Sequence, residues 1–567
     1  MPPARTLPYP VRKSRRLLIA AFIAVVTISL LALLKKQLAP AARPGELSVL
    51  IVVDQLTPDD LAALWPAFGP GGFKRLAAEG AQFTAARQDH AITLTCPGHA
   101  ALLTGGYGAL NGIVGNDWFD RAGRATGRCG GAGQPSCSVL CTDSPQTHRL
   151  AQGGMLRVDT IADAYLRAPE GGRALFISLK ARSALIAARD GRTLPVWFAA
   201  NKFITLSPET PSATAVSSRA LPVITLTGAD GDWLPLANDA PPAAADADAA
   251  PWERPPAGWT KSFPHHIPAL NSPAFGVLFS ESPFAATAET ALALALIKRE
   301  RYGLRGGRDF VLLSYSGYDL LAHDYGHHSR EARDFLLRLD RELAALLSAL
   351  QAQASPGKLR VILSSDHGAA EIPERRAARL GGGARAGRLN EADLVTVAEN
   401  SLITAFGPAP AGMKDAKYVD AFRPPHLYLN TPLLGARLSP AMEIAQTALL
   451  RLDHVAAVLT GDGVCALDDA RAKLFCRDDD GERSGHLLVV PQENYFFGES
   501  ATTHGTPWDY DRRVPLFIWP ARAGEAKGDI AAPVSAACAA GTFARDAKIA
   551  WPAPRAADCF SAAALAK

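Results

Sequence analysis

The chain has 567 residues, of which 48% are hydrophobic, and its formal net charge is only +4. This composition is typical of a globular protein with a large core, and the length indicates several domains or one large domain with insertions. The small net charge, without a basic stripe interleaved with aromatic residues, argues against a nucleic-acid-binding surface.

The first 45 residues are typical of a membrane-targeting segment. Four basic residues precede an uncharged apolar run, Leu17–Leu34, which just reaches the length needed to span a bilayer. More positive charge lies before the run than after it, so we expect the body of the protein to be exported to the periplasmic side. We interpret the run as a single-pass signal anchor. The alternative is a cleaved signal peptide that would release a soluble periplasmic protein.

The eight cysteines also favour export. No pair has C-x-x-C spacing, so structural disulfides in an oxidising compartment are favoured over a zinc ribbon. Two pairs that lie close in sequence are expected to be bonded, Cys465 with Cys476 and Cys538 with Cys559. The pairing of the other four stays open: Cys96, Cys129, Cys137 and Cys141.

Four short apolar runs rich in β-branched residues predict buried parallel strands, and each ends on polar residues. In chain order they are 47–54, 174–180, 309–319 and 359–368. Helical patterns at 73–79, 98–106, 286–298 and 329–351 lie between them. This alternation predicts an α/β fold, in which a mostly parallel central sheet is flanked by helices.

We divide the chain into an N-terminal segment (1–45), a main catalytic domain (46–520) and a tail packed on that domain (521–567). Loop or cap insertions are expected near 120–150, 205–275 and 370–395. Within them, the Ala/Pro/Asp-rich stretch 236–258 and the basic stretch 375–388 are predicted to be surface loops.

Acids and histidines collect at the ends of the predicted strands. Because the carboxyl ends of parallel strands meet at one edge of a sheet, these side chains should come together. A histidine four residues after an acid lies on the same face of a helix. Three carboxylates and three imidazoles suit two divalent metals, with zinc favoured over magnesium. The six residues are Asp54, Asp319, His323, Asp366, His367 and His504.

The turn before the 98–106 helix carries hydroxyl groups at Thr93 and Thr95. A hydroxyl at a helix start lies near free backbone N–H groups, which favour anionic oxygen. A threonine there is also typical of an ordinary helix cap. The turn therefore indicates a reactive hydroxyl only in combination with the predicted metal ligands.

Together these stretches resemble the alkaline phosphatase superfamily, in the branch that joins nucleotide pyrophosphatase/phosphodiesterases to a monomeric periplasmic type of alkaline phosphatase. The resemblance runs from residue 51 to about 520, and order and spacing agree throughout. The matching stretches are Ile51–Gln55, Thr93–Ala100, Thr104–Gly105, Gly112–Trp118, Ser178–Arg182, Asp319–His323, Ser365–Ala369 and Thr503–Thr506.

The resemblance implies a monomeric phosphate monoester hydrolase with two Zn²⁺ ions, acting on small-molecule phosphate esters through a covalent phosphothreonine at Thr95. Asn116 would donate its amide to a phosphoryl oxygen, and water would complete the reaction at the second zinc. The resemblance implies one zinc held by Asp54, Asp366 and His367, and the other by Asp319, His323 and His504.

Lys180 and Arg182 separate the branches of the family. Two cations that reach the non-bridging oxygens favour a dianionic monoester over a diester, and the Lys-x-Arg pair resembles the monoesterase pattern. The alternatives left open are a phosphodiesterase or nucleotide pyrophosphatase, and a phosphonate hydrolase. From a different class, a membrane-tethered pseudoenzyme that binds without catalysis is also left open.

Overall fold

The structure is a computed structural model. By its internal contacts the chain splits into two units, Met1–Arg43 and Pro44–Lys567, and the second is described here. The residues described are 43–121, 125–128, 156–188, 192–205, 221–222, 224–236, 246–381, 385–410 and 416–551. The predicted anchor Leu17–Leu34 lies outside these ranges, and within them no helix has the length and hydropathy to cross a bilayer.

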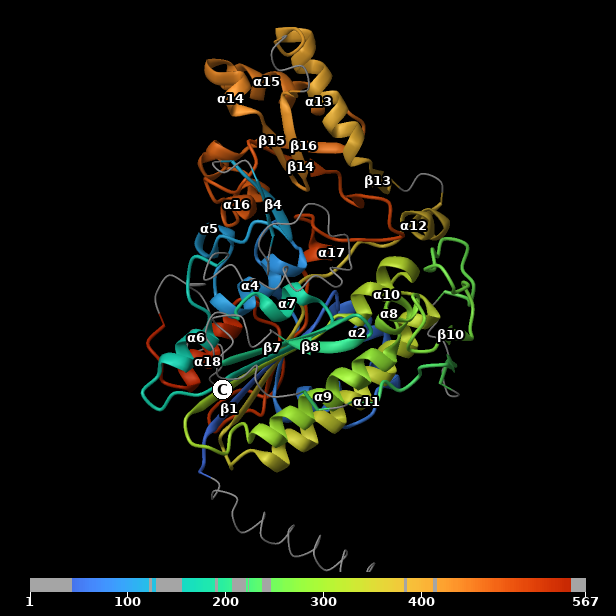
Figure 1. The fold of residues 1–567 in the computed structure, drawn as a ribbon, viewed down its shortest axis with the longest axis vertical. Coiled ribbons are helices and arrows are strands. Elements are labelled where there is room, and N and C mark those ends of the chain that lie inside the picture. The colour runs from blue at the N-terminus through green and yellow to red at the C-terminus, as the bar shows by residue number, and fades with distance from the viewer. Residues whose placement is uncertain are drawn as a thin grey trace, which may run out of the picture. The chain divides into compact units, whose positions relative to one another are not determined.

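A nine-stranded sheet forms the centre of the fold (Figure 1). Its strand order is β20-β2-β19-β12-β1-β11-β6-β7-β8, and the five neighbours from β12 to β7 run parallel. The predicted α/β fold with a mostly parallel sheet is therefore confirmed. In chain order the strands are β1 (Glu46–Val53), β2 (Ala81–Phe83), β6 (Ala174–Ser178), β7 (Thr193–Ala199), β8 (Lys202–Thr205), β11 (Arg308–Tyr315), β12 (Leu359–Ser364), β19 (Leu516–Trp519) and β20 (Gly528–Ile530).

Strand β1 shows how the sheet builds two hydrophobic faces. Successive side chains point to opposite faces of a strand, so Val49 and Ile51 pack into one core while Leu50 and Val52 pack into the other. A strand buried on both faces is expected to read as a continuous apolar run, which is how this one was identified. One core includes α3 (Phe73–Glu79), α9 (Pro283–Glu300) and α11 (Arg330–Gln353); the other includes α4 (Thr95–Thr104), α6 (Ile161–Arg167) and α18 (Cys538–Asp546).

The chain between β12 and β19 forms a region that we call the cap, residues 385–497. Its four-stranded sheet has the order β14-β15-β17-β16, and it has a hydrophobic cluster of its own. The cap elements are β14 (Val419–Arg423), β15 (His426–Leu429), β16 (Val455–Thr460), β17 (Leu487–Pro491), α13 (Glu391–Phe406), α15 (Leu438–Leu449) and α16 (Ala470–Cys476). Short helices near the central sheet are α2 (Pro58–Leu64), α5 (Gly108–Asn111), α7 (Ala181–Leu185) and α10 (Gly317–Tyr325).

One predicted loop is partly a helix. The stretch 375–388 was expected to be a basic surface loop, but Pro373–Leu380 forms α12. Its arginines form ion pairs with acids outside the basic run: Arg375 and Arg379 both donate to Glu371, and Arg375 also donates to Asp246 at 2.8 Å. The basic stretch therefore contains an ion-paired helix. The described part of the other predicted loop, 246–258, contains no helix or strand.

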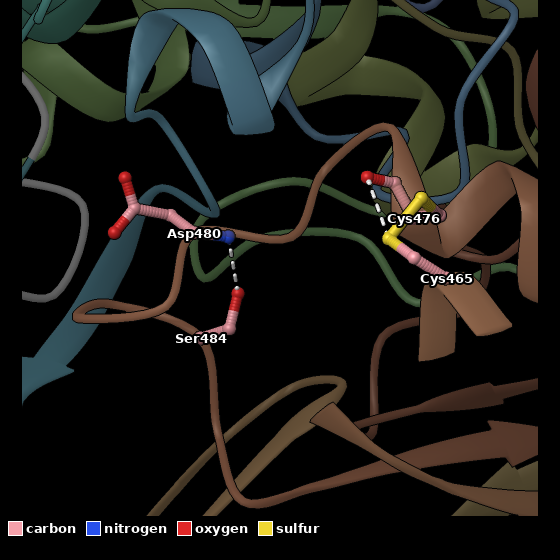
Figure 2. The surroundings of a disulfide bond; sticks show 4 residues. All are labelled: Cys465, Cys476, Asp480 and Ser484. Carbon is pink, nitrogen blue, oxygen red and sulfur yellow. Dashed lines mark hydrogen bonds between the residues drawn. A yellow bond between two sulfur atoms is a disulfide. The ribbon is translucent and has the colours of Figure 1, made fainter. Parts of the chain in front are cut away.

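The predicted disulfide between Cys465 and Cys476 is present in the cap (Figure 2). Cys96 and Cys538 each take part in a disulfide as well. Four other cysteines lie outside the described residues: Cys129, Cys137, Cys141 and Cys559.

Candidate active site

Four neighbouring strands bring the predicted site residues to one edge of the sheet. Strands β12, β1, β11 and β6 are adjacent and parallel, so their carboxyl ends lie side by side. Asp54 follows β1 directly, and Asp366 comes two residues after β12. Asp319 lies in the first turn of α10, after β11, and Lys180 stands between β6 and α7. The strand-end rule used on the sequence therefore placed these side chains at the same edge.

The six predicted ligands form two triads. The first contains Asp54, Asp366 and His367, and the second contains Asp319, His323 and His504; within each, one ligand atom per residue lies within 4.8 Å of the others. His504 comes from the loop between β18 (Tyr495–Phe497) and α17 (Asp509–Arg512). Its ring stacks on that of His367, with the ring centroids 3.5 Å apart, which places the two triads next to each other.

Backbone carbonyl oxygens orient the three imidazoles. A carbonyl only accepts hydrogen bonds, so the nitrogen facing it carries the proton and the other nitrogen is left to ligate. Metal-binding histidines commonly have this arrangement. The Nδ1 atom donates to the carbonyl of Thr502 in His323 (2.9 Å), of Gly368 in His367 (3.1 Å) and of Thr93 in His504 (2.8 Å).

Lys180 lies between the two triads and is buried. Its Nζ is 2.6 Å from Asp54 Oδ2 and 2.5 Å from Asp319 Oδ2. Burial by itself would raise the pKa of Asp54, and the nearby Asp319 adds to this, but Lys180 and His367 hold that pKa below its usual value. Burial would likewise lower the pKa of Lys180, but Asp319 and Asp54 outweigh it and raise that pKa.

The two stacked imidazoles have opposite pKa shifts. Burial, reinforced by His367, lowers the pKa of His504 to about 3, so its ring is neutral and able to ligate. Burial also disfavours the charged form of His367, but the carboxylates of Asp366 and Asp54 outweigh it and raise the pKa of His367 to about 9. A cation bound in the first triad would displace that proton.

The residues present fit a metal centre. Among the described residues, three buried donor atoms of the first triad make no hydrogen bond of good geometry: Asp54 Oδ1, Asp366 Oδ2 and His367 Nε2. They face one another, since His367 Nε2 lies 3.3 Å from Asp54 Oδ1 and 3.6 Å from Asp366 Oδ2. Buried polar atoms are nearly always paired, so such a group indicates a missing partner. Lys180 contacts two of the three carboxylates, Asp54 and Asp319, and a mixed set of oxygen and nitrogen donors suits zinc.

Thr95 is the first residue of α4, which packs closely on the turn that carries Asp366. A Cβ atom at Gly98 would lie only 2.2 Å from the carbonyl oxygen of Asp366, so glycine permits this approach. Arg182 Nη2 lies 3.5 Å from Thr95 Oγ1. The backbone N–H of Cys96 donates to Asn116 Oδ1 at 2.9 Å, which leaves the NH₂ group of Asn116 to donate elsewhere.

His99 was not predicted as a site residue. Its Nδ1 donates to the carbonyl oxygen of Thr95 at 2.8 Å, and its Nε2 lies 2.8 Å from Ser314 Oγ on the neighbouring β11. It therefore links the start of α4 to the central sheet. The helix was expected to start at residue 98, but it starts at Thr95, and only this earlier start puts His99 one turn further along the same face.

Gln55 was also missed. Its side-chain Nε2 donates to Asp319 Oδ1 at 2.9 Å, and its backbone N–H donates to Asp366 Oδ1 at 3.3 Å. It thereby joins one carboxylate of each triad from the position directly after Asp54. Adjacency to that acid was the only signal for Gln55 in the sequence.

Comparison with known proteins gives the family. The model of the type I phosphodiesterase / nucleotide pyrophosphatase family matches residues 48–512. The chain is 28% identical to alkaline phosphatase PhoK of Sphingomonas sp, over 84% of each chain. It is 25% identical to alkaline phosphatase PafA of Elizabethkingia meningoseptica, over 85% of this chain and 88% of that one. It is 30% identical to alkaline phosphatase PhoV of Synechococcus elongatus, where the match spans only 60% of that relative and 59% of this chain.

Solved structures give the same result. The crystal structure of wild-type alkaline phosphatase PafA has a TM-score of 0.76 and 25% identity, covering 91% of this chain and 98% of that one. Murine ectonucleotide pyrophosphatase / phosphodiesterase 5 shares the fold, with a TM-score of 0.51 at 12% identity over 90% of this chain and 96% of that one. The chain therefore belongs to the type I phosphodiesterase / nucleotide pyrophosphatase family, within the alkaline phosphatase superfamily, and is a phosphoric ester hydrolase.

Proposed function

We propose that this protein is a two-zinc phosphate monoester hydrolase in which Thr95 is the nucleophile. The observation that carries the proposal is the pair of buried triads at one sheet edge, together with a basic side chain beside a hydroxyl at a helix start. The relatives named as alkaline phosphatases support the same reaction class.

In this proposal each triad holds one Zn²⁺. The unpaired buried atoms of the first triad and the carbonyl-oriented imidazoles of both support this assignment. When bound, two such ions stabilise negative charge on the attacking and leaving oxygens of an in-line displacement at phosphorus. The ligands would be Asp54, Asp366 and His367 for one ion, and Asp319, His323 and His504 for the other.

The chain's own groups would carry the substrate through two displacements. Thr95 would give its hydroxyl proton to solvent, and its Oγ1 would attack the phosphorus while the bond from phosphorus to the ester oxygen breaks. The leaving oxygen would take one proton back from solvent, so that the alcohol departs and a phosphothreonine remains. A water molecule would then attack this phosphorus and lose one proton, while the bond to Thr95 breaks, the Thr95 oxygen regains a proton, and inorganic phosphate leaves. Arg182 lies beside Thr95, and Asn116 accepts from the Cys96 N–H through Oδ1. In this proposal Arg182 and the Asn116 NH₂ group would donate hydrogen bonds to the non-bridging oxygens and stabilise the charge that develops on them.

Lys180 and Arg182 would select the monoester. A monoester is nearly dianionic, whereas a diester carries one charge and an additional substituent, so two neighbouring cations favour the monoester. A solved variant of PafA has a threonine, an asparagine, a lysine and an arginine replaced. This chain has the same four residue types in the same order: Thr95, Asn116, Lys180 and Arg182. The spacing from the threonine to the asparagine is the same in both proteins, and so is the spacing from the lysine to the arginine. This agreement supports their assignment as one functional set.

We also propose that the protein is a monomer exported to the periplasmic side and anchored there by Leu17–Leu34. The disulfides of the described part of the chain support an oxidising compartment. Protease added to spheroplasts should digest the body of the protein, while protection equal to that of a cytoplasmic marker would contradict the proposal.

Thr95→Ala should reduce hydrolysis of an aryl phosphate monoester at least about 1,000-fold, because the covalent route is removed and only positioning and charge stabilisation remain. Steady-state rates with zinc-loaded protein measure this, and trapping of ³²P on the wild-type chain but not on the variant identifies the intermediate. Activity within tenfold of wild type, with zinc still bound, would remove Thr95 from the mechanism.

Replacing both Lys180 and Arg182 by alanine should reduce kcat/KM for the monoester about 100-fold or more, and reduce the matching diester rate by less than tenfold. The reason is that the two cations stabilise the second negative charge, which the monoester carries and the diester lacks. Paired assays on one preparation give the ratio directly. A wild-type preference for the diester would instead place the chain with the phosphodiesterases of its family.

Metal removal tests the two triads. Dialysis against a chelator should abolish activity and lower the thermal midpoint, because the cations stabilise only the folded state, and Zn²⁺ should restore both. Elemental analysis should find two zinc ions per wild-type chain and one fewer in Asp366→Ala. Full zinc content in that variant would contradict the assignment of the first triad.

A further inference from the structure

Asp478 is a buried acid of the cap that contacts the segment leading to Thr95. Its side chain is 1% exposed. Oδ2 accepts hydrogen bonds from the backbone N–H groups of Ala91 (2.9 Å) and Ile92 (3.0 Å), and Oδ1 accepts from that of Gly108 (3.4 Å). His90 Nδ1 lies 3.0 Å from Oδ1, and because a carboxylate only accepts, the imidazole is the donor. One carboxylate thus binds three backbone N–H groups and one ring.

These donors flank α4 on both sides. Residues 90–92 lead into the helix, and Gly108 begins α5, which follows it. The approach is tight, because a Cβ atom at Gly108 would lie 2.5 Å from the carbonyl oxygen of Asp478. The backbone N–H of Ala109 donates to the carbonyl of Arg477 at 2.9 Å, so the contact continues into the main chain. The helix that carries Thr95 is therefore tied to one cap residue both before its start and after its end.

Only residues 93 and 94 separate this anchor from Thr95, and both are also held. The carbonyl of Thr93 accepts from His504 Nδ1 at 2.8 Å, and Thr93 Oγ1 donates to the carbonyl of Thr506 at 2.9 Å. The backbone N–H of Leu94 donates to the carbonyl of Ile92 at 2.9 Å. Residues 90–94 therefore form one hydrogen-bonded segment that ends at Thr95, and the Asp478 contacts fix the start of that segment.

Asp478 is itself fixed from the cap side. Helix α16 ends two residues earlier at Cys476, which is bonded to Cys465 (Figure 2). The side chain of Ile92 packs in a hydrophobic cluster with Phe475 from the same helix. The disulfide and this cluster hold the helix end, so the carboxylate is presented in a defined position.

From this geometry we infer that Asp478 is a positioning residue for the reaction, which fixes the course of residues 90–94 so that the Thr95 hydroxyl meets the phosphorus. The inference rests on the proposed function, because it requires Thr95 to be the nucleophile. The Asp478 carboxylate binds the segments that flank α4, so its loss would act through the backbone. We expect that loss to lower kcat and to leave KM nearly unchanged.

The matched control is Asp480, two residues further along. It is also buried, but its backbone N–H donates to Ser484 Oγ at 2.9 Å within its own turn (Figure 2), and its carboxylate accepts from Arg157 at 2.9 Å. The described contacts of Asp480 thus lie away from residues 90–94, although it shares the segment, the charge and the burial of Asp478.

The experiment compares zinc-loaded, full-length Asp478→Asn and Asp480→Asn with wild type in aryl phosphate hydrolysis. An amide NH₂ in place of one carboxylate oxygen faces backbone N–H donors and cannot accept from them. Asp478→Asn should lower kcat about 10- to 100-fold with KM within threefold and zinc content unchanged, while Asp480→Asn stays within threefold of wild type. Equal losses in the two variants, or kcat within threefold for Asp478→Asn, would overturn the inference.

A double substitution separates positioning from general damage. If Asp478 acts through Thr95, adding Asp478→Asn to Thr95→Ala should change the residual rate by less than twofold; a multiplicative loss would overturn the inference. Full activity of Thr95→Ala alone would refute the proposed function itself, and that result is distinct from any result at Asp478.

If Asp478→Asn does not fold, His90→Phe tests the inference in its place. It preserves an aromatic ring against Tyr107, on which His90 stacks, but removes one donor to the Asp478 carboxylate. A three- to tenfold loss in kcat with unchanged KM and zinc content supports the inference, and a kcat within twofold of wild type contradicts it.

Discussion

The site depends on three carboxylates that lie close together at a buried place, where like charges repel strongly. Parallel strands β12, β1 and β11 each deliver a carboxylate to one buried edge, and helices covering both faces of the sheet prevent the strands from spreading apart. Buried carboxylates favour their neutral form unless cations oppose this. Here Lys180 supplies one positive charge between two of them. The buried carboxylates therefore favour the binding of further cations at this edge. Metal ions held there would in turn attract the anionic phosphoryl group.

The sequence was sufficient for this part because strand-end chemistry follows from local order. An apolar run rich in β-branched residues identifies a buried parallel strand, and the residue after it must lie at the functional edge of an α/β sheet. The four-residue spacing of Asp319 and His323 likewise fixed their shared face on α10. Each of these predictions used residues that are close in the chain, for which backbone geometry alone determines the relative direction of side chains.

The predictions that failed or were missing concern partners distant in the chain. The basic stretch predicted a loop where helix α12 forms, because the acids that pair with its arginines, Glu371 and Asp246, lie outside that stretch. Asp478 gave no signal, because its donors are nearly 400 residues earlier and meet it only after the cap has folded. Gln55 and His99 stood beside residues that were identified, but their roles depend on which strand becomes the neighbour of which. Such roles are set by tertiary packing, which local patterns do not encode.

The contact of the cap with residues 90–92 limits how parts of this chain can be exchanged with those of its relatives. The stretch around Thr95 is compact in sequence. Its conformation nevertheless depends in part on hydrogen bonds to the carboxylate of Asp478, which belongs to the cap and comes much later in the chain. A chimera that takes its cap from a relative would keep this support only if the incoming cap carries a hydrogen-bond acceptor at the place of Asp478. In this chain the cap and the stretch before Thr95 are therefore coupled through one carboxylate, and a change of one region has to be judged together with the other.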